Sequence, residues 1–93
     1  MSASSEIVAS GAEAVVVLPA NLHARPAGRL AQLAARFGAR VEVECGGRAV
    51  NPTGVLSVMS LGATAGATVV VRAWGDDAAD AVQALAELLR TAE

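Results

Sequence analysis

The segment over residues 21–27, which reads NLHARPA, is the place in this chain where residue types and spacing indicate chemistry. His23 is the only histidine, and Arg25 adds a permanent positive charge two positions later. An uncharged imidazole is a nucleophile near neutral pH. If a helix begins here, the backbone N–H groups of Ala24, Arg25 and Ala27 are free to bind an anion. The segment is therefore chemically compatible with a histidine that takes up a phosphoryl group and holds it at the positive end of a helix.

Pro26 leaves two possible starting points for that helix. A residue before proline disfavours helical backbone, so the helix could begin at Pro26 and run over residues 26–37, with Arg25 as a poor N-cap. Alternatively, the helix begins directly after His23, and Pro26 stands in its first turn. Both alternatives place His23 at the helix start.

Other kinds of active site have little support. A zinc site needs three or four ligands, and one histidine with one cysteine (Cys45) does not supply them, so we expect no metal and no cofactor. All seven cationic side chains are arginines, which excludes a P-loop lysine and a Schiff-base lysine. No G-x-S-x-G motif occurs, although residue order alone does not exclude a Ser-His-Asp hydrolase. From the pattern alone, an inert surface histidine is the commoner case.

Composition limits the class of protein and its partners. The formal net charge is −2 and the pI about 5.3, so we expect neither nucleic acid nor an anionic membrane as a partner. No stretch reaches the roughly 18 apolar residues of a membrane span, and the N-terminus lacks the features of a signal peptide. A single cysteine fits a reducing compartment, and we predict a cytoplasmic protein.

The remaining pattern predicts an α+β domain. Residues 1–9 are interpreted as a flexible extension and residues 10–93 as one domain, with Val, Leu and Ala filling the core because aromatics make up only 2%. Strands are predicted over residues 13–18 (buried on both faces), 40–45, 48–50 and 68–74, with a turn at Gly46-Gly47. Helices are predicted over residues 26–37, over residues 54–61 with Thr53 as N-cap, and after a cap at Asp77. The order β-α-β-β-α-β-α favours a four-stranded, mainly antiparallel sheet covered on one face by three helices.

Two surfaces suggest contact with other proteins. The outer face of the first helix is basic, with Arg25, Arg29 and Arg36, and suits acidic partner surfaces. The short helix carries more apolar residues than one face can bury, so we expect a mixture of core and exposed positions. The predicted interface residues are Arg29, Val55, Leu56 and Met59.

The motif Leu22-His23-Ala24-Arg25-Pro26-Ala27 resembles the active-site signature of HPr, the histidine-containing phosphocarrier family of the bacterial phosphoenolpyruvate:sugar phosphotransferase system. A second match covers residues 46–51 (GGRAVN) and 55–62 (VLSVMSLG), and the resemblance extends over residues 10–92. It implies an open-faced β-sandwich that acts as a carrier rather than as a self-contained enzyme. It also implies that enzyme I, charged by phosphoenolpyruvate, phosphorylates Nδ1 of His23. Arg25 would stabilise charge during transfer, and the group would pass to sugar-specific enzyme IIA proteins. We expect a monomer.

The sequence departs from the family pattern at one regulatory position. Many members carry a serine, the target of an ATP-dependent kinase, where this chain has Gly54. Control by such a kinase is therefore not expected here. Two alternatives stay open: an HPr-like regulatory module whose phosphorylation at His23 is read by a nitrogen-control or transcriptional partner, and a plain interaction domain with an inert His23. The sugar that is served cannot be read from the sequence.

Overall fold

The computed structural model describes residues 11–92. The elements along the chain are β1 (Gly11–Val17), α2 (Ala24–Ala34), β2 (Arg40–Cys45), β3 (Arg48–Val50), α3 (Val55–Met59), β4 (Thr68–Trp74) and α4 (Ala78–Arg90). The predicted order β-α-β-β-α-β-α is confirmed. The predicted extension over residues 1–9 lies outside the described residues, as do positions 10 and 93 at the two ends of the predicted domain, so these boundaries remain predictions.

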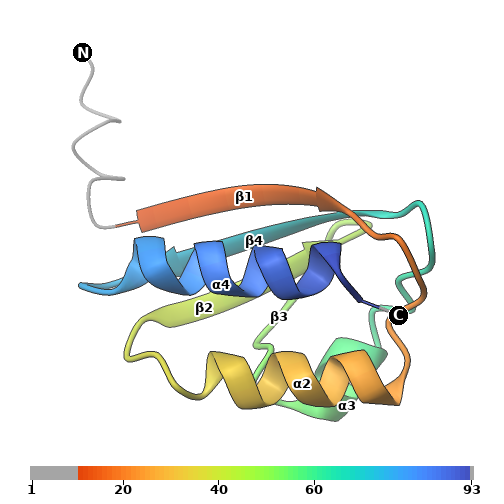
Figure 1. The fold of residues 1–93 in the computed structure, drawn as a ribbon, viewed down its shortest axis with the longest axis horizontal. Helices are drawn as coiled ribbons and strands as arrows, with labels where there is room; N and C mark the ends of the chain where they lie inside the picture. The colour runs from red at the N-terminus through yellow and green to blue at the C-terminus, as the bar shows by residue number, and fades with distance from the viewer. Residues whose placement is uncertain (1–10, 93) are drawn as a thin grey trace.

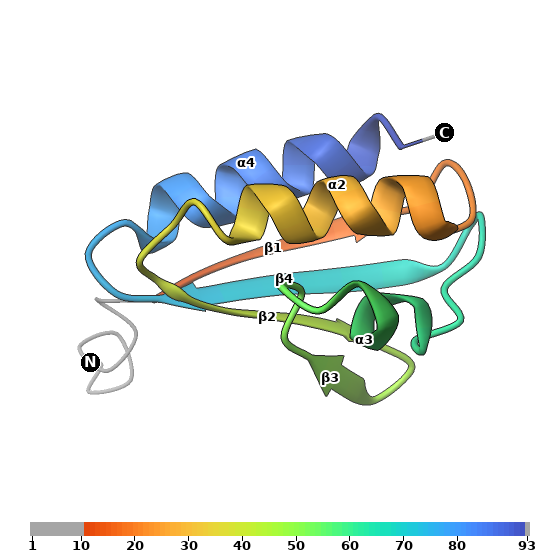
Figure 2. The ribbon, with the colours of Figure 1, turned by 90° about the horizontal axis from the view of Figure 1, so that it is seen from below.

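The four strands form one antiparallel sheet in the order β1-β4-β2-β3. Helices α2 and α4 lie side by side over one face of the sheet, and α3 packs against α2 near β3 (Figures 1 and 2). The other face of the sheet carries no helix within the described part of the chain. The predicted fold class, an open-faced sandwich with three helices, is therefore confirmed.

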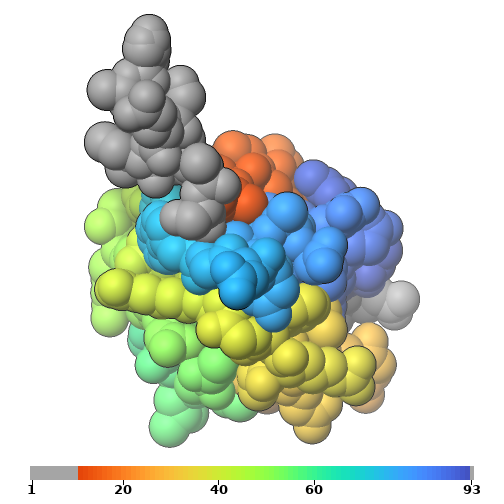
Figure 3. Space-filling view, turned by 90° about the vertical axis from the view of Figure 1, so that its left-hand side faces the viewer, coloured from red at the N-terminus to blue at the C-terminus, as the bar shows by residue number. Residues whose placement is uncertain are grey.

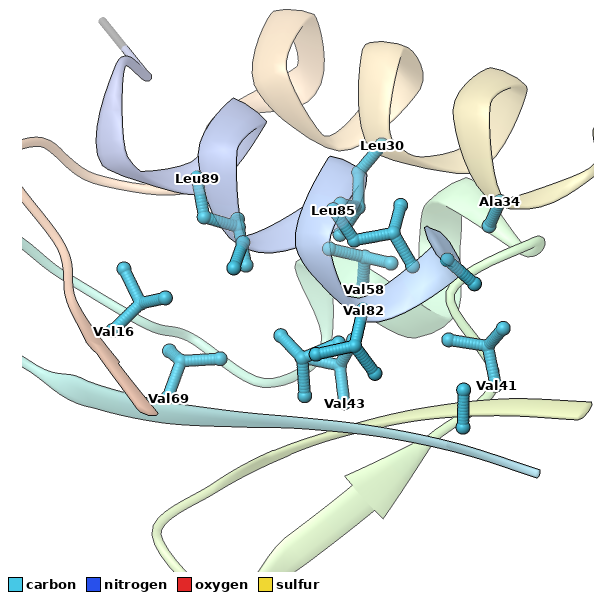
Figure 4. Close-up of a cluster of buried hydrophobic side chains, with 14 of the residues drawn as sticks. Val16, Leu30, Ala34, Val41, Val43, Val58, Val69, Val82, Leu85 and Leu89 are labelled. Atoms are coloured by element: carbon cyan, nitrogen blue, oxygen red, sulfur yellow. The ribbon is translucent and has the colours of Figure 1, made fainter. Parts of the chain in front are cut away.

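The core fills the space between the sheet and the helices. Every second strand residue points into it, as a pleated strand requires, and the apolar side of each long helix packs from above (Figure 4). The side chains that meet there are small and aliphatic, and they include Val16, Leu30, Val43, Val58, Val69, Val82, Leu85 and Leu89. The low aromatic content is thus matched by close packing of Val, Leu and Ala.

The first strand differs from its prediction. It was expected over residues 13–18 with both faces buried, but β1 is an edge strand, and Val15 and Val17 are 57% and 62% exposed. Only Val16 of the strand is fully buried. The reason is that helices cover one face, so the alternate residues of a uniformly apolar run must face outward.

The open face of the sheet is organised around Arg72. Its guanidinium lies 2.6 Å from Glu44 and 3.6 Å from both Glu13 and Glu42, which are its cross-strand neighbours on β1 and β2, respectively. The hydrogen bond to Glu44 raises the pKa of Arg72 above its ordinary value, so the group stays charged. At the end of the same face Arg40 stacks over the Trp74 ring, 5.8 Å from its centroid. We name Arg72 and these three glutamates the sheet-face cluster.

The ends of the short helix were predicted incorrectly. Helix α3 covers Val55–Met59, and Gly54 rather than Thr53 is its N-cap. Thr53 belongs to the turn that precedes the helix, because both its N–H and its hydroxyl donate to the Asn51 side chain, at 3.0 and 2.8 Å. Such a local turn competes with capping. The predicted Gly46-Gly47 turn is confirmed, and both residues have the positive φ values (61° and 83°) that favour glycine.

At the end of the molecule shown in Figure 3, the start of α4 meets the connection between α2 and β2. Asp77 occupies the N-cap position of α4 as predicted, but its carboxylate accepts a hydrogen bond from the Gly38 N–H, at 2.9 Å, instead of capping its own helix. Gly75, with φ of 129°, passes close to Ala39 here. Within residues 11–92, no helix has the length and apolar composition of a membrane span.

Candidate functional site

His23 is the N-cap residue of α2. Its backbone is extended (φ −73°, ψ −177°), its carbonyl accepts the Ala27 N–H at 3.0 Å, and its own N–H donates to the Asn21 carbonyl at 2.9 Å. The side chain is exposed and makes no capping hydrogen bond. The imidazole is therefore accessible to a partner protein, directly beside a helix start.

The structure decides between the two predicted helix starts. Helix α2 begins at Ala24, so Pro26 stands in the first turn, where the missing N–H costs no hydrogen bond. The helix also ends earlier than predicted, at Ala34 instead of residue 37. Beyond Ala34 the N–H groups of Arg36 and Phe37 bond three residues back, which tightens the last turn.

The helix start offers two backbone donors rather than the three predicted. The N–H groups of Ala24 and Arg25 have no helical acceptor, because the helix begins with them. Pro26 has no N–H. The Ala27 N–H is bound to the His23 carbonyl, so we remove Ala27 from the predicted phosphate-binding set. An anion on His23 would thus meet the amides of Ala24 and Arg25 at the positive end of α2.

The predicted cation lies next to this helix start. Arg25 and Arg29 are both exposed and stand one helical turn apart on α2. Together with Leu88, Thr91 and Ala92 they line a hollow of about 100 Å³ between the start of α2 and the end of α4. Within residues 11–92 neither arginine forms an ion pair with a carboxylate, which leaves both guanidinium groups available to an incoming anion. A larger hollow, of about 360 Å³, lies on the open sheet face beside Trp74 and shares no residue with this site.

The apolar residues of α3 divide as the sequence indicated. Val58 is fully buried in the core, whereas Leu56 is 81% exposed, and Met59 and Val55 are 39% and 36% exposed. Helix α3 packs beside α2, so these exposed side chains and the basic face of α2 lie on neighbouring helices (Figure 2). We name Val55, Leu56 and Met59 the α3 patch.

One polar residue of the site was not singled out from the sequence. Asn21 accepts a hydrogen bond from the Ala65 N–H, 44 residues further along the chain, through its side-chain oxygen. Asparagine in a loop is common, and the partner of such a side chain is known only once the two loops are seen together.

Comparison with known proteins agrees with this geometry. The family model of the PTS HPr component phosphorylation site matches residues 11–91. The structure is similar to the phosphocarrier protein HPr of Bacillus anthracis str. Ames, with a TM-score of 0.80 and 33% identity over 86% of this chain and 98% of that one. It is also similar to Crh, the catabolite repression HPr of Bacillus subtilis, with a TM-score of 0.73 and 32% identity over 89% and 99%. A dimer of HPr from Thermoanaerobacter tengcongensis matches with a TM-score of 0.67 and 40% identity over 72% and 77%.

Proposed function

This chain belongs to the HPr family of phosphocarrier proteins of the phosphotransferase system, and on that basis we propose that it accepts a phosphoryl group from enzyme I on Nδ1 of His23 and passes it to enzyme IIA proteins in sugar uptake. The observation that carries the proposal is the position of His23: an exposed N-cap next to two free backbone amides. We place this activity in the cytoplasm and assign it to a monomer. Dimers are described for two similar proteins, and size-exclusion chromatography with light scattering tests the monomer.

The chemistry needs one nucleophilic nitrogen and a place for negative charge. The Nδ1 lone pair attacks phosphorus, an N–P bond forms, and the bond from phosphorus to the donor protein breaks, so the electron pair of that bond returns to the donor. The phosphoryl group then carries its charge at the start of α2, where the amides of Ala24 and Arg25 and the helix dipole stabilise it. Transfer to enzyme IIA repeats the step with the roles exchanged.

In this proposal, Arg25 stabilises the transition state of phosphoryl transfer. During the step the oxygens of the phosphoryl group carry negative charge between the donor and acceptor atoms. Positive groups that are already in place stabilise this charge without rearrangement of the site. The exposed guanidinium of Arg25 is two residues from His23 and has no carboxylate partner within residues 11–92. It is therefore free to turn toward the phosphoryl group when a partner closes over the site.

The same surface must fit two partners in turn. The α3 patch supplies apolar side chains for the centre of the contact, and Arg29 supplies charge at its rim. The α3 patch lies on α3, which packs against α2, the helix that carries Arg29 and begins at His23. A partner that covers both helices together with His23 would exclude water from the transfer.

A regulatory role is the second candidate, and it is favoured by the similarity to Crh at nearly the same identity as to HPr. In that role the phosphorylation state of His23 would be read by a nitrogen-control or transcriptional partner. Control through serine phosphorylation at position 54 is a separate mechanism, and Gly54 excludes it because a kinase would find no hydroxyl there.

The decisive test is phosphorylation of the purified chain by an active enzyme I with labelled phosphoenolpyruvate. We expect acid-labile, base-stable label that is absent in His23→Ala and unchanged in Gln32→Ala, a matched control on the exposed face of the same helix. Chase with enzyme IIA should remove the label. Absence of label from the wild-type chain would refute the carrier function, and stable label with no loss to any enzyme IIA would favour the regulatory role.

A further inference from the structure

The connection between β1 and α2, which carries His23, is tied to a second loop. At one end the Leu18 N–H donates to the Ala67 carbonyl at 2.9 Å, and the Leu18 carbonyl accepts the Gly66 N–H at 2.8 Å. At the other end the Leu22 N–H donates to the Ala63 carbonyl at 3.0 Å. These three bonds are between backbone groups, so they do not depend on which side chains are present.

Asn21 adds a fourth link, and this one depends on its side chain. Its Oδ1 atom accepts the Ala65 N–H at 2.8 Å, while its backbone carbonyl accepts the His23 N–H at 2.9 Å. One residue therefore holds the loop over residues 63–67 with one oxygen and the backbone of His23 with the other. The donor to Oδ1 is a backbone N–H, so the orientation of the side-chain amide is fixed by chemistry.

We propose that Asn21 is a positioning residue for phosphoryl transfer, which sets the place of the His23 imidazole relative to the rest of the molecule. The inference rests on the proposed function of His23. On the C-terminal side, the His23 backbone is fixed by α2 through the bond to Ala27. On the N-terminal side, the carbonyl of Asn21 holds it, and the side chain of Asn21 anchors that carbonyl to the second loop.

The need for such an anchor follows from the reaction. The nitrogen of His23 must meet phosphorus in line on two different partner proteins, and a misplacement of about 1 Å costs on the order of a hundredfold in rate. Asn21 is exposed, and water can replace its bond to Ala65. Loss of the side chain should therefore disturb the position of His23 more than the stability of the fold.

The experiment compares Asn21→Ala with Thr64→Ala. Thr64 is exposed in the second loop, and within residues 11–92 its hydroxyl makes no hydrogen bond, so its variant is the matched control. Enzyme I and phosphoenolpyruvate give kcat and KM for each chain as the phosphoryl acceptor. We expect kcat of Asn21→Ala to fall about tenfold to a hundredfold, with KM within about twofold of wild type and Thr64→Ala unchanged.

A second readout needs no phosphorylation. Amide exchange at Ala65, followed by NMR, should quicken roughly twofold to tenfold in Asn21→Ala, the equivalent of one lost hydrogen bond, and the His23 amide and ring resonances should shift. Asn21→Asp keeps the Oδ1 acceptor and should restore both. An equal kcat in Asn21→Ala and wild type would overturn the positioning role. If enzyme I places no label on the wild-type chain, the proposed carrier function fails. The NMR measurement does not depend on that result: unchanged His23 resonances in Asn21→Ala would overturn the positioning role by themselves.

Discussion

Replacement of Leu56 by alanine should weaken docking without weakening the fold. The substitution removes three carbons, each worth about 0.8 kcal/mol when buried. Because Leu56 is 81% exposed in the free chain, most of that value is still available to a partner. If the partner covers the side chain fully, the loss is about 2 kcal/mol, or roughly 25-fold in the dissociation constant. The same exposure means that the free energy of unfolding should change by less than about 0.5 kcal/mol.

Val58, two residues further along α3 and fully buried, provides the control. Val58→Ala should lower the free energy of unfolding by about 1–3 kcal/mol, because it leaves a cavity, while the α3 patch is retained. Titration calorimetry with enzyme I measures docking, and urea unfolding measures stability. The reasoning fails if Leu56→Ala binds within twofold of wild type, or if it loses as much stability as Val58→Ala.

Three further predictions follow from the same structure. Arg25→Ala should slow transfer from enzyme I about tenfold to a hundredfold and leave the melting temperature within about 2 °C of wild type; equal transfer rates would show that the guanidinium is a bystander. Gly75→Ala should cost about 1–3 kcal/mol in thermal unfolding, since φ is 129° and a Cβ would lie 3.2 Å from Ala39, whereas Gly28→Ala, with open space around it, should gain about 0.5–1 kcal/mol. A serine kinase of the HPr-modifying type should leave the whole chain unmodified in mass spectrometry, because Gly54 has no hydroxyl; phosphate on Ser57 would contradict this.

Much of the fold could be predicted because the spacing of the apolar residues and the positions of the turn residues indicate the same elements. The alternation of Val41 and Val43 with Glu42 and Glu44 gave the bounds of β2, and Gly46-Gly47 gave the hairpin. The burial of β1 could not be predicted, because a uniformly apolar run fits a strand covered on both faces as well as one covered on a single face. Its place at the edge is decided by the pairing with β4, which is remote in sequence.

The candidate site was predictable as a motif and less so as geometry. Histidine, arginine and proline at this spacing indicate a helix start, but they fit Ala24 and Pro26 equally well as the first helical residue. The structure places the start at Ala24, and this also decides that the Ala27 amide is not free. The link from Asn21 to Ala65 joins two loops that no local pattern relates, so it could not be inferred before the fold was known.

The sheet-face cluster has a consequence for how the molecule meets its partners. Three carboxylates surround the single guanidinium of Arg72 on the open face, while Arg25, Arg29 and Arg36 lie exposed on a helix that covers the opposite face. Two surfaces of opposite charge thus lie on different sides of the sheet: Arg25 and Arg29 beside His23, and the net negative sheet-face cluster on the open face. An acidic partner surface attracts the first of these surfaces and repels the second, so encounters that begin with the reactive face toward the partner are favoured. Added salt shortens the range of these forces to a few ångströms, and productive collisions become rarer although every atom of the contact is unchanged.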